Sequence, residues 1–331
     1  MVHQSADSRL RFWAILAGLA VPIAFLTVLA FFARLWWVAE LATHFRLQYA
    51  FCATLLAVGV ALSRKYLVTV AILALAALNA AFVLPLYVGR QPSAPGPELR
   101  CLLLNVNTSS REYDRVAAIV KEGAADIVAL LEVNGEWRER LSRLVDSTYY
   151  TFWEPRPDNF GIALLTRLVP IGSGTHYFGS GGVPSIACTL ATAELPLVVL
   201  ATHPLPPRNT EYARGRNTQL GAIGDWATRQ TMPVLVVGDL NATPFSPQFR
   251  GLLTRSGLRN SQKGFGFQGT WPSSSPVLRI PIDHILHSRR FHVSSRRIGP
   301  NTGSDHLAVL ATLDLQAMPV QPPGAGDQRL K

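Results

Sequence analysis

The chain has 331 residues, of which 48% are hydrophobic, and a formal net charge of +10. Only 3 residues are cysteine, which excludes a fold held together by a framework of disulfides. No CxxC or HExxH spacing indicates a structural zinc site. The positive charge suits an anionic partner, such as nucleic acid, a phosphorylated molecule or acidic lipid head groups, without selecting among them.

The first 89 residues contain three apolar runs. Residues 12–33, 47–62 and 67–89 carry no charge, and Asn79 is the strongly polar interruption of the third run. A helix needs about 20 apolar residues to cross a bilayer, so the first and third runs are long enough and the second is short. A cleaved signal peptide is the alternative for the first run, but two more apolar runs follow it. We therefore predict a membrane anchor with about three transmembrane helices in residues 1–89.

Basic residues beside these runs predict the orientation. Arg9 and Arg11 precede the first run, and Arg64 and Lys65 separate the second from the third. Three spans place both groups on one side, which the positive-inside rule assigns to the cytoplasm. The rest of the chain, after Gly89, then lies outside the cytoplasm. Loss of the short second span would reverse this orientation.

A Pro/Gly-rich stretch at 90–98 predicts a linker, and residues 316–331 predict a disordered tail. Between them, apolar runs with strand or helix periodicity alternate with turns. Helices are expected at 113–124, 136–147 and 216–229, and strands at 99–106, 126–133, 160–167, 185–192, 195–203, 233–240, 282–288 and 306–315. Continuous apolar strands mixed with helices indicate an α/β or α+β layered fold.

Polar side chains recur where these strands begin or end. They are Asn105, Glu132, His203, Asp239, Asn241, Asp283, Asp305 and His306. Buried and unpaired carboxylates would cost several kcal/mol, so we expect the strand ends to converge on one hydrated cleft. Carboxylates and amides without cysteine favour a hard cation such as Mg²⁺ or Mn²⁺, which pairs with phosphate oxygens. Histidines there would transfer protons or bind a phosphoryl group.

Six motifs follow one another in the chain: LLLNVN, LLEVN, THP, GDLNATP, IDHIL and GSDHLAV. In this order they resemble the endonuclease/exonuclease/phosphatase superfamily, and most of all its membrane-anchored bacterial branch. The resemblance covers residues 99–315. It implies a four-layer α/β sandwich, with two packed mixed β-sheets flanked by helices and the site at one end.

The resemblance also implies roles for these residues. Glu132 would bind the divalent metal, helped by Asn105 and Asp305. Whether one or two metals act is left open, and Asn107 is an alternative to Asn105. Asn105 and Glu132 each have a purely structural alternative. Asn105 could cap a turn, and Glu132 could be the acidic residue at the start of the following helix.

The remaining residues would act on the substrate. Asp239 would orient or deprotonate the attacking water, and Asn241 would hold water or phosphate. His306, positioned by Asp283, would contact the scissile phosphate and take part in proton transfer, and His203 would be a second phosphate contact or acid. Whether Asp239 or His306 is the base stays open. A turn motif is the alternative for Asp239 and Asn241.

Three functions are compatible with the sequence. The first is a metal-dependent phosphoesterase acting on a small or lipid phosphoester near the membrane. The second is a nuclease acting on extracytoplasmic DNA or RNA, although no long basic and aromatic insertion that would grip a duplex is present. The third, a non-catalytic membrane-tethered binding module, is disfavoured because the set of site residues is complete.

Cys101 and Cys188 lie in strand-like runs and are expected to be small buried hydrophobes that could pair after export.

Overall fold

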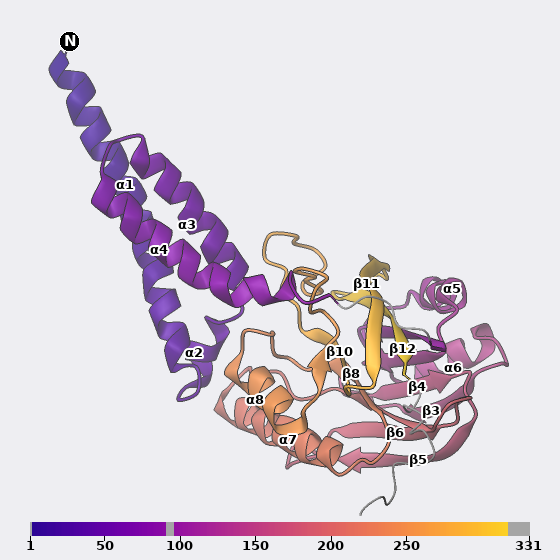
Figure 1. Ribbon diagram of the computed structural model, residues 1–331. Helices are drawn as coiled ribbons and strands as arrows, with labels where there is room; N and C mark the ends of the chain where they lie inside the picture. Colours follow the sequence, from indigo (N-terminus) through magenta and orange to yellow (C-terminus); the bar gives the residue numbers. More distant parts are fainter. Residues whose placement is uncertain (1, 91–95, 317–331) are drawn as a thin grey trace, which may run out of the picture.

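The computed structural model describes residues 2–90 and 96–316. The predicted linker at 90–98 and tail at 316–331 fall for the most part outside these residues. The described chain has two parts, a bundle of apolar helices and a domain of two β-sheets with helices on its outer faces (Figure 1). Both parts agree in kind with the sequence-based expectation.

The N-terminal bundle consists of α1 (Val2–Leu29), the short α2 (Trp37–Leu41), α3 (Arg46–Ala61) and α4 (Tyr66–Val83), with single 3₁₀ turns at Ala30–Phe32 and Leu84–Leu86. Small side chains such as Ala53 and Ala57 let the helices approach closely. Asn79, the polar interruption of the third apolar run, is fully buried and satisfied between helices. It accepts a hydrogen bond from Arg46 (2.9 Å) and donates one to Thr27 (2.9 Å).

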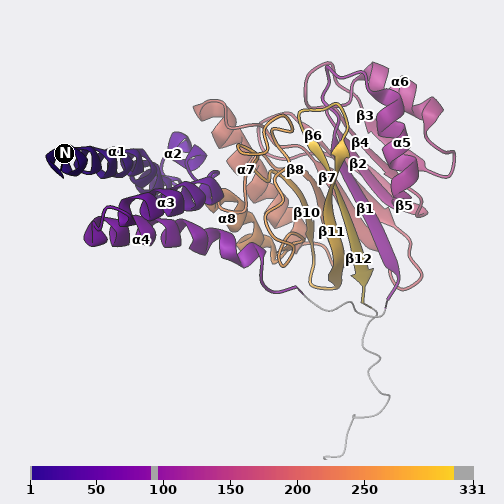
Figure 2. The same cartoon turned by 90° about the horizontal axis from the view of Figure 1, so that it is seen from above.

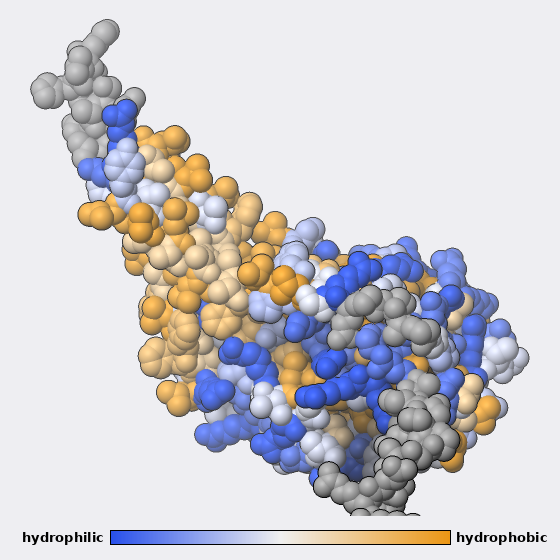
Figure 3. Space-filling view, viewed as in Figure 1, coloured by the Kyte–Doolittle hydropathy of each residue, from blue (hydrophilic) through white to orange (hydrophobic). Residues whose placement is uncertain are grey.

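Two stretches of this bundle are long and apolar enough to cross a membrane, Phe12–Phe32 and Tyr66–Leu86, each of 21 residues. The middle helix, α3, is apolar but shorter. Large side chains cover the outside of the bundle, with Phe25 64% and Leu67 89% exposed. The surface of the bundle is accordingly apolar, and that of the other part is mostly polar (Figure 3).

The second part is a sandwich of two six-stranded mixed sheets, in the order β11-β12-β1-β2-β4-β3 and β5-β6-β7-β8-β10-β9. The first sheet contains β1 (Glu98–Asn105), β2 (Ile127–Leu131), β3 (Tyr150–Glu154), β4 (Ile162–Thr166), β11 (Phe291–Asn301) and β12 (Leu307–Leu315). The second contains β5 (Pro170–Tyr177), β6 (Pro184–Leu190), β7 (Leu197–Thr202), β8 (Val234–Asp239), β9 (Arg259–Asn260) and β10 (Asp283–His287).

Helices cover the outer face of each sheet. α5 (Tyr113–Gly123) and α6 (Gly135–Leu144) pack on the first sheet, and α7 (Thr210–Thr228) and α8 (Pro247–Ser256) pack on the second. Seen from above, the helical bundle lies beside α7 and α8, with α5 and α6 at the opposite side (Figure 2). The predicted four-layer sandwich is confirmed.

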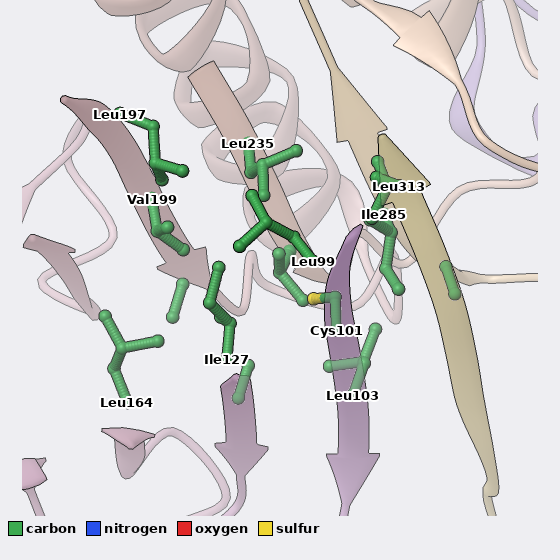
Figure 4. Packing of buried hydrophobic residues seen from close by; sticks show 14 of the residues in the cluster. Leu99, Cys101, Leu103, Ile127, Leu164, Leu197, Val199, Leu235, Ile285 and Leu313 are labelled. Carbon is green, nitrogen blue, oxygen red and sulfur yellow. The ribbon is translucent and has the colours of Figure 1, made fainter. Parts of the chain in front are cut away.

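The main core lies between the sheets. Leu99, Cys101 and Leu103 of β1 face Val199 and Leu235 of the second sheet across it (Figure 4). Cys101 and Cys188 are both buried in this core as free thiols, as expected for small hydrophobes.

The topology brings the predicted polar residues to one end of the sandwich. β1 and β2 are parallel in one sheet, and β7 and β8 are parallel in the other, so four strands end on the same side. β10 and β12 run antiparallel to their neighbours and therefore begin there, with Asp283 of β10 directly opposite Asp239 of β8. Strand direction thus explains why some of the residues follow strands and others precede them.

Several elements were not expected from the sequence. The edge strand β5 has mostly exposed residues and lacks the apolar alternation that predicts a strand. β3, β11 and α8 were also missed, and β11 is interrupted by two shifts of register against β12. α7 begins at Thr210, six residues before the predicted start at 216, because Asn209 caps its first turn by accepting a hydrogen bond from the Tyr212 N–H.

Candidate active site

One cavity of about 520 Å³ opens at this end of the sandwich, and both sheets contribute to its wall. Six of the predicted residues line it: Glu132, His203, Asp239, Asn241, Asp305 and His306. The other two do not line the cavity but contact residues that do. Asn105 is hydrogen-bonded to Glu132, and Asp283 is hydrogen-bonded to His306. The volume lies in the range of pockets that hold a small ligand or one end of a larger one.

His306 lies at the centre of a buried charged cluster. Its Nδ1 is 2.9 Å from Oδ2 of Asp283, and its Nε2 is 3.7 Å from Oδ2 of Asp239. The Nε2 atom of His203 approaches the same Asp239 oxygen to 3.5 Å. Two imidazoles and two carboxylates, all with side chains at most 5% exposed, therefore lie in one compact group.

The carboxylates decide the charge of the histidines. Burial alone would lower the pKa of His306, but Asp283 and Asp239 outweigh it and raise this pKa to about 10. Burial likewise opposes the charge of His203, whose pKa is nevertheless raised by Asp239 and Glu132. Burial would raise the pKa of Asp283, and the neighbouring His306 instead holds it below its usual value. At neutral pH His306 is thus a cation, oriented through Nδ1 by Asp283.

Glu132 follows β2 and is 8% exposed. Its Oε1 accepts a hydrogen bond from Nδ2 of Asn105 (2.9 Å), and its Oε2 accepts one from the Thr108 N–H (3.4 Å). In the described part of the chain, no Lys or Arg forms an ion pair with this carboxylate. A buried carboxylate that is paired with no Lys or Arg is favoured by a bound cation, and carboxylate oxygens suit a hard divalent ion.

Asp305 is tied to the wall of the cavity. Its Oδ1 accepts from Nδ2 of Asn107 (2.8 Å), and its Oδ2 accepts from Nε1 of Trp271 (3.0 Å). Burial would raise the pKa of Asp305, but His306 and these two donors hold it below its usual value. Asn107 itself lines the cavity, whereas Asn105 lies behind Glu132, so both asparagines stay candidates for the metal-binding amide.

A second group could also hold a metal. Asp239, Asp283 and His306 each offer one ligand atom, all within 4.8 Å of one another. The donors are a nitrogen and two oxygens, and His306 would have to lose its proton to bind an ion there. The Glu132 carboxylate, hydrogen-bonded to neutral N–H donors and paired with no Lys or Arg among the described residues, is the better match for a hard ion.

Asn241 is held by its backbone as well as its side chain. Its φ is +48°, in the left-handed region, so the extended geometry of β8 does not continue through Asn241. Its N–H donates to Oδ1 of Asp239 (2.9 Å), its Nδ2 donates to the Pro204 carbonyl (2.9 Å), and Arg216 donates to its carbonyl (2.8 Å). Asn107 and Glu132 also have positive φ, at +60° and +62°. Backbone strain of this kind gathers at functional sites.

Sequence reasoning missed several residues of the cavity wall. Leu41 is the last residue of α2, and His44 lies between α2 and α3. The imidazole Nδ1 of His44 lies 3.1 Å from Oγ1 of Thr243. Burial, together with Arg216, lowers the pKa of His44 to about 3, so this imidazole is neutral. Further residues of the wall that sequence reasoning missed include Asp158, Asn159, Phe160, Arg208 and Tyr212. Arg208 follows the THPLPP motif and could have been suspected, but nothing in the sequence points to Leu41 or His44.

Comparisons with known proteins agree with the fold. The model of the Endonuclease/Exonuclease/phosphatase family matches residues 102–306. No curated protein sequence matches the chain.

Solved structures share the fold at low sequence identity. An endonuclease/exonuclease/phosphatase from Beutenbergia cavernae is 21% identical, with a TM-score of 0.55 over 67% of this chain and 73% of the other. The human Nocturnin catalytic domain with bound sulfate is 20% identical (TM-score 0.55, covering 69% and 98%). D. rerio TDP2 complexed with a single-strand DNA product is 16% identical (TM-score 0.57, covering 66% and 99%). Likeness at this identity establishes the fold.

Proposed function

Because the chain belongs to the endonuclease/exonuclease/phosphatase family, whose members hydrolyse phosphoester bonds, we propose that it is a membrane-anchored, divalent-metal-dependent phosphoesterase. It would hydrolyse a phosphodiester or phosphomonoester with an activated water molecule. One observation carries the proposal: Glu132, Asp239 and His306, which come from three strands in two sheets, face the same cavity.

The metal would be held by Glu132, with help from Asn105 and Asp305. Mg²⁺ or Mn²⁺ suits these oxygen donors. Bound there, the ion would offset negative charge on the phosphoryl oxygens. Among the described residues no Lys or Arg pairs with Glu132, and this supports the assignment.

The protein groups would move the protons. Asp239 would orient a water molecule and accept its proton as the water oxygen attacks phosphorus. His306 is already protonated and so is poorly suited as the base, but its Nε2–H can donate to the phosphoryl oxygens while Asp283 holds the ring. As the ester P–O bond breaks, the leaving oxygen would take a proton from His203 or from water. Asn241 would hold the water or the phosphate.

The helical bundle would anchor the enzyme in a bilayer. Phe12–Phe32 and Tyr66–Leu86 have the length and composition of spans, and α3 would be the shorter third span. With Arg64 and Lys65 on the cytoplasmic side, the catalytic domain would lie outside the cytoplasm of a bacterial inner membrane.

A substrate panel tests this function. The full-length protein in lipid nanodiscs is incubated with bis(p-nitrophenyl) phosphate, inositol phosphates, phospholipids including sphingomyelin, plasmid and single-stranded DNA, with Mg²⁺, Mn²⁺ or a chelator. We expect metal-dependent release of product from at least one phosphoester, and loss of activity with chelator. Hydrolysis of nucleic acid alone would establish the nuclease alternative, and no hydrolysis of any substrate would favour a binding module.

A further inference from the structure

An apolar groove of about 630 Å³ lies between the helical bundle and the catalytic domain. Its walls come from α1, α2, α3 and the loop that carries Val277 and Leu278. Gln48 is its one strongly polar lining residue. The apolar surface of the bundle continues down to the domain in Figure 3.

The groove lies in the half of the bundle nearest the catalytic domain. It follows α1 from Ile23 to Leu29, the end of that helix, and the first half of α3 up to Cys52. Six residues of helix cover about 9 Å, which is well over half of one leaflet of a hydrocarbon core about 30 Å thick. With Phe12–Phe32 as a span, the groove would lie at the depth of the acyl chains in the leaflet that faces the domain.

Leu41 connects the groove to the catalytic cavity. This residue ends α2 and lines both the groove and the cavity that contains Asp239 and His306. Since α2 joins two helices of the bundle at the domain side, it lies where the bilayer interface would be. A lipid head group at this level would lie beside the catalytic residues while its chain entered the groove.

The catalytic domain contributes its own apolar contact. Val277 is 76% and Leu278 54% exposed, although they belong to a domain with a mostly polar surface. Gln48 of α3 donates to the carbonyls of Val277 (3.0 Å) and Arg279 (3.2 Å), so the loop is fastened to the membrane helices. Two branched aliphatic side chains held at this depth would be solvated by lipid.

We propose that the groove binds an acyl chain, and that the substrate is a bilayer lipid whose phosphoester reaches the cavity past Leu41. This inference rests on the proposed function of the cavity. A nucleic acid has no apolar segment to fill the groove. An ordinary lipid-facing surface would need neither a catalytic-domain loop closing one side nor a residue shared with the catalytic cavity.

Acyl-chain length provides the test. The full-length protein is assayed in detergent with phosphatidylglycerol, phosphatidylcholine and phosphatidic acid carrying four-carbon or eight-carbon chains, beside bis(p-nitrophenyl) phosphate. If one chain enters the groove, kcat/KM should rise on the order of a hundredfold from four to eight carbons, since four more methylene groups leave water.

Filling the groove should remove that gain. Cys52→Trp, on its wall, is compared with Val58→Trp, which is on the same helix and 57% exposed outside the groove. We expect the ratio of eight-carbon to four-carbon kcat/KM to fall at least tenfold in the first and to stay unchanged in the second. Leu278→Asp, compared with Val169→Asp on a distant exposed strand end, repeats the test without changing a helix.

The outcomes separate the two proposals. Hydrolysis of bis(p-nitrophenyl) phosphate without a chain-length effect would overturn the lipid inference and leave the phosphoesterase intact, as would nucleic acid as the one substrate hydrolysed. An equal loss of chain-length preference in Val58→Trp would place the lipid contact elsewhere on the bundle. No metal-dependent hydrolysis of any ester would overturn the function itself.

Discussion

At the scale of single residues, His306 and Asp239 are the two side chains expected to act directly on the water and the phosphoester. His306 is a buried cation held 2.9 Å from Asp283 and 3.7 Å from Asp239. We expect His306→Ala and Asp239→Ala each to lower kcat by roughly 10²–10⁴-fold, the usual contribution of a positioned acid or base. Activity is measured on whichever phosphoester the full-length protein hydrolyses best.

Asp225→Asn is the matched control, because this carboxylate is half-exposed and pairs with Arg255 on the surface. It should keep the wild-type rate. Near-wild-type kcat in both the His306 and Asp239 variants, with unchanged melting temperatures, would show that the chemistry lies elsewhere.

Glu132 makes a separate prediction about the metal. Replacing it with Gln keeps the shape and the hydrogen bond from Asn105 but removes the charge that would bind the ion. We expect Mn²⁺ affinity, measured by the paramagnetic signal of free Mn²⁺, to fall at least tenfold, a loss that outer-shell substitutions alone can cause. Glu136→Gln, in the first turn of α6, is the control. Equal affinity in the two variants would remove Glu132 from the metal site.

His287 predicts how stability changes with pH. Burial holds its pKa at about 4, against an ordinary value of 6.5. Between these values the unfolded chain binds a proton that the folded chain does not, so stability falls as the pH falls from 6.5 toward 4. Relative to His287→Gln, the wild type should lose about 2 kcal/mol between pH 7 and pH 5. Melting temperatures that stay parallel over this range would contradict the buried neutral state.

The site was largely predictable from the sequence, because its residues occur where apolar strands begin or end. Glu132 and Asp239 could be found in this way, since a carboxylate after a buried run calls for a hydrated cleft. Which asparagine faces the cavity could not, because it depends on the backbone turn after β1, where Asn107 adopts a φ of +60°. Leu41 and His44 could not be predicted as lining residues, because they reach the cavity only through the packing of the helical bundle against the domain.

At the scale of elements, the helical bundle and the catalytic domain are joined by a buried ion pair. Glu40 of α2 pairs with Arg216 of α7, and both side chains are fully buried. Glu40 also accepts a hydrogen bond from Ser246 (2.6 Å), and Arg216 also donates to the carbonyl of Asn241 (2.8 Å). The link therefore runs from the helical bundle to the backbone of Asn241, which lines the cavity.

Breaking this pair should be costly. Glu40→Gln leaves Arg216 buried without its counter-charge, which typically costs 3–5 kcal/mol and corresponds to a fall in Tm on the order of 10 °C. The double variant Glu40→Met/Arg216→Met should regain part of that loss. Arg255→Met, which breaks the exposed pair with Asp225, should cost under about 1 kcal/mol. If the losses of unfolding free energy in the single variants Glu40→Met and Arg216→Met add up to the loss in the double variant, the two side chains are not coupled.

The elements that the sequence missed share a physical reason. β5 and β3 are edge strands with one face toward solvent, so tertiary pairing rather than an apolar pattern makes them strands. α8 is only ten residues long and depends on the Ser246 cap and on packing against α7. Buried central strands such as β8 carry their pattern in the sequence and were found within a residue or two.

At the scale of the whole molecule, the bundle is docked rather than tethered. The backbone carbonyl of Leu86 accepts from the N–H groups of Gly264 and Gly266, each at 2.8 Å, and the side chains of Val83 and Leu86 pack with Phe245. Together with the ion pair between Glu40 and Arg216, these contacts fix the position of the catalytic cavity relative to the helical bundle. Such docking gives a reason for more than one apolar helix, since a simple tether would need only one.

The orientation across the bilayer depends on the short helix α3. Its 16 residues span about 24 Å, less than a hydrocarbon core of about 30 Å, so it would cross by local thinning. The ammonium of Lys65, after α3, lies 5.1 Å from the ring centre of Trp13, near the start of the first apolar run. The basic loop and the N-terminal side of α1 therefore share one end of the bundle, away from the domain (Figure 1).

This arrangement predicts that the catalytic domain faces away from the cytoplasm. Alkaline phosphatase, which is active only after export, should be active when fused after residue 316 and inactive when fused after Lys65, in a bacterial host. Replacing Arg64 and Lys65 with Glu should weaken the difference, because the positive-inside bias is then reduced. Activity at the Lys65 fusion and none at residue 316 would mean that the domain lies in the cytoplasm, and its lipid substrate would then come from the inner leaflet.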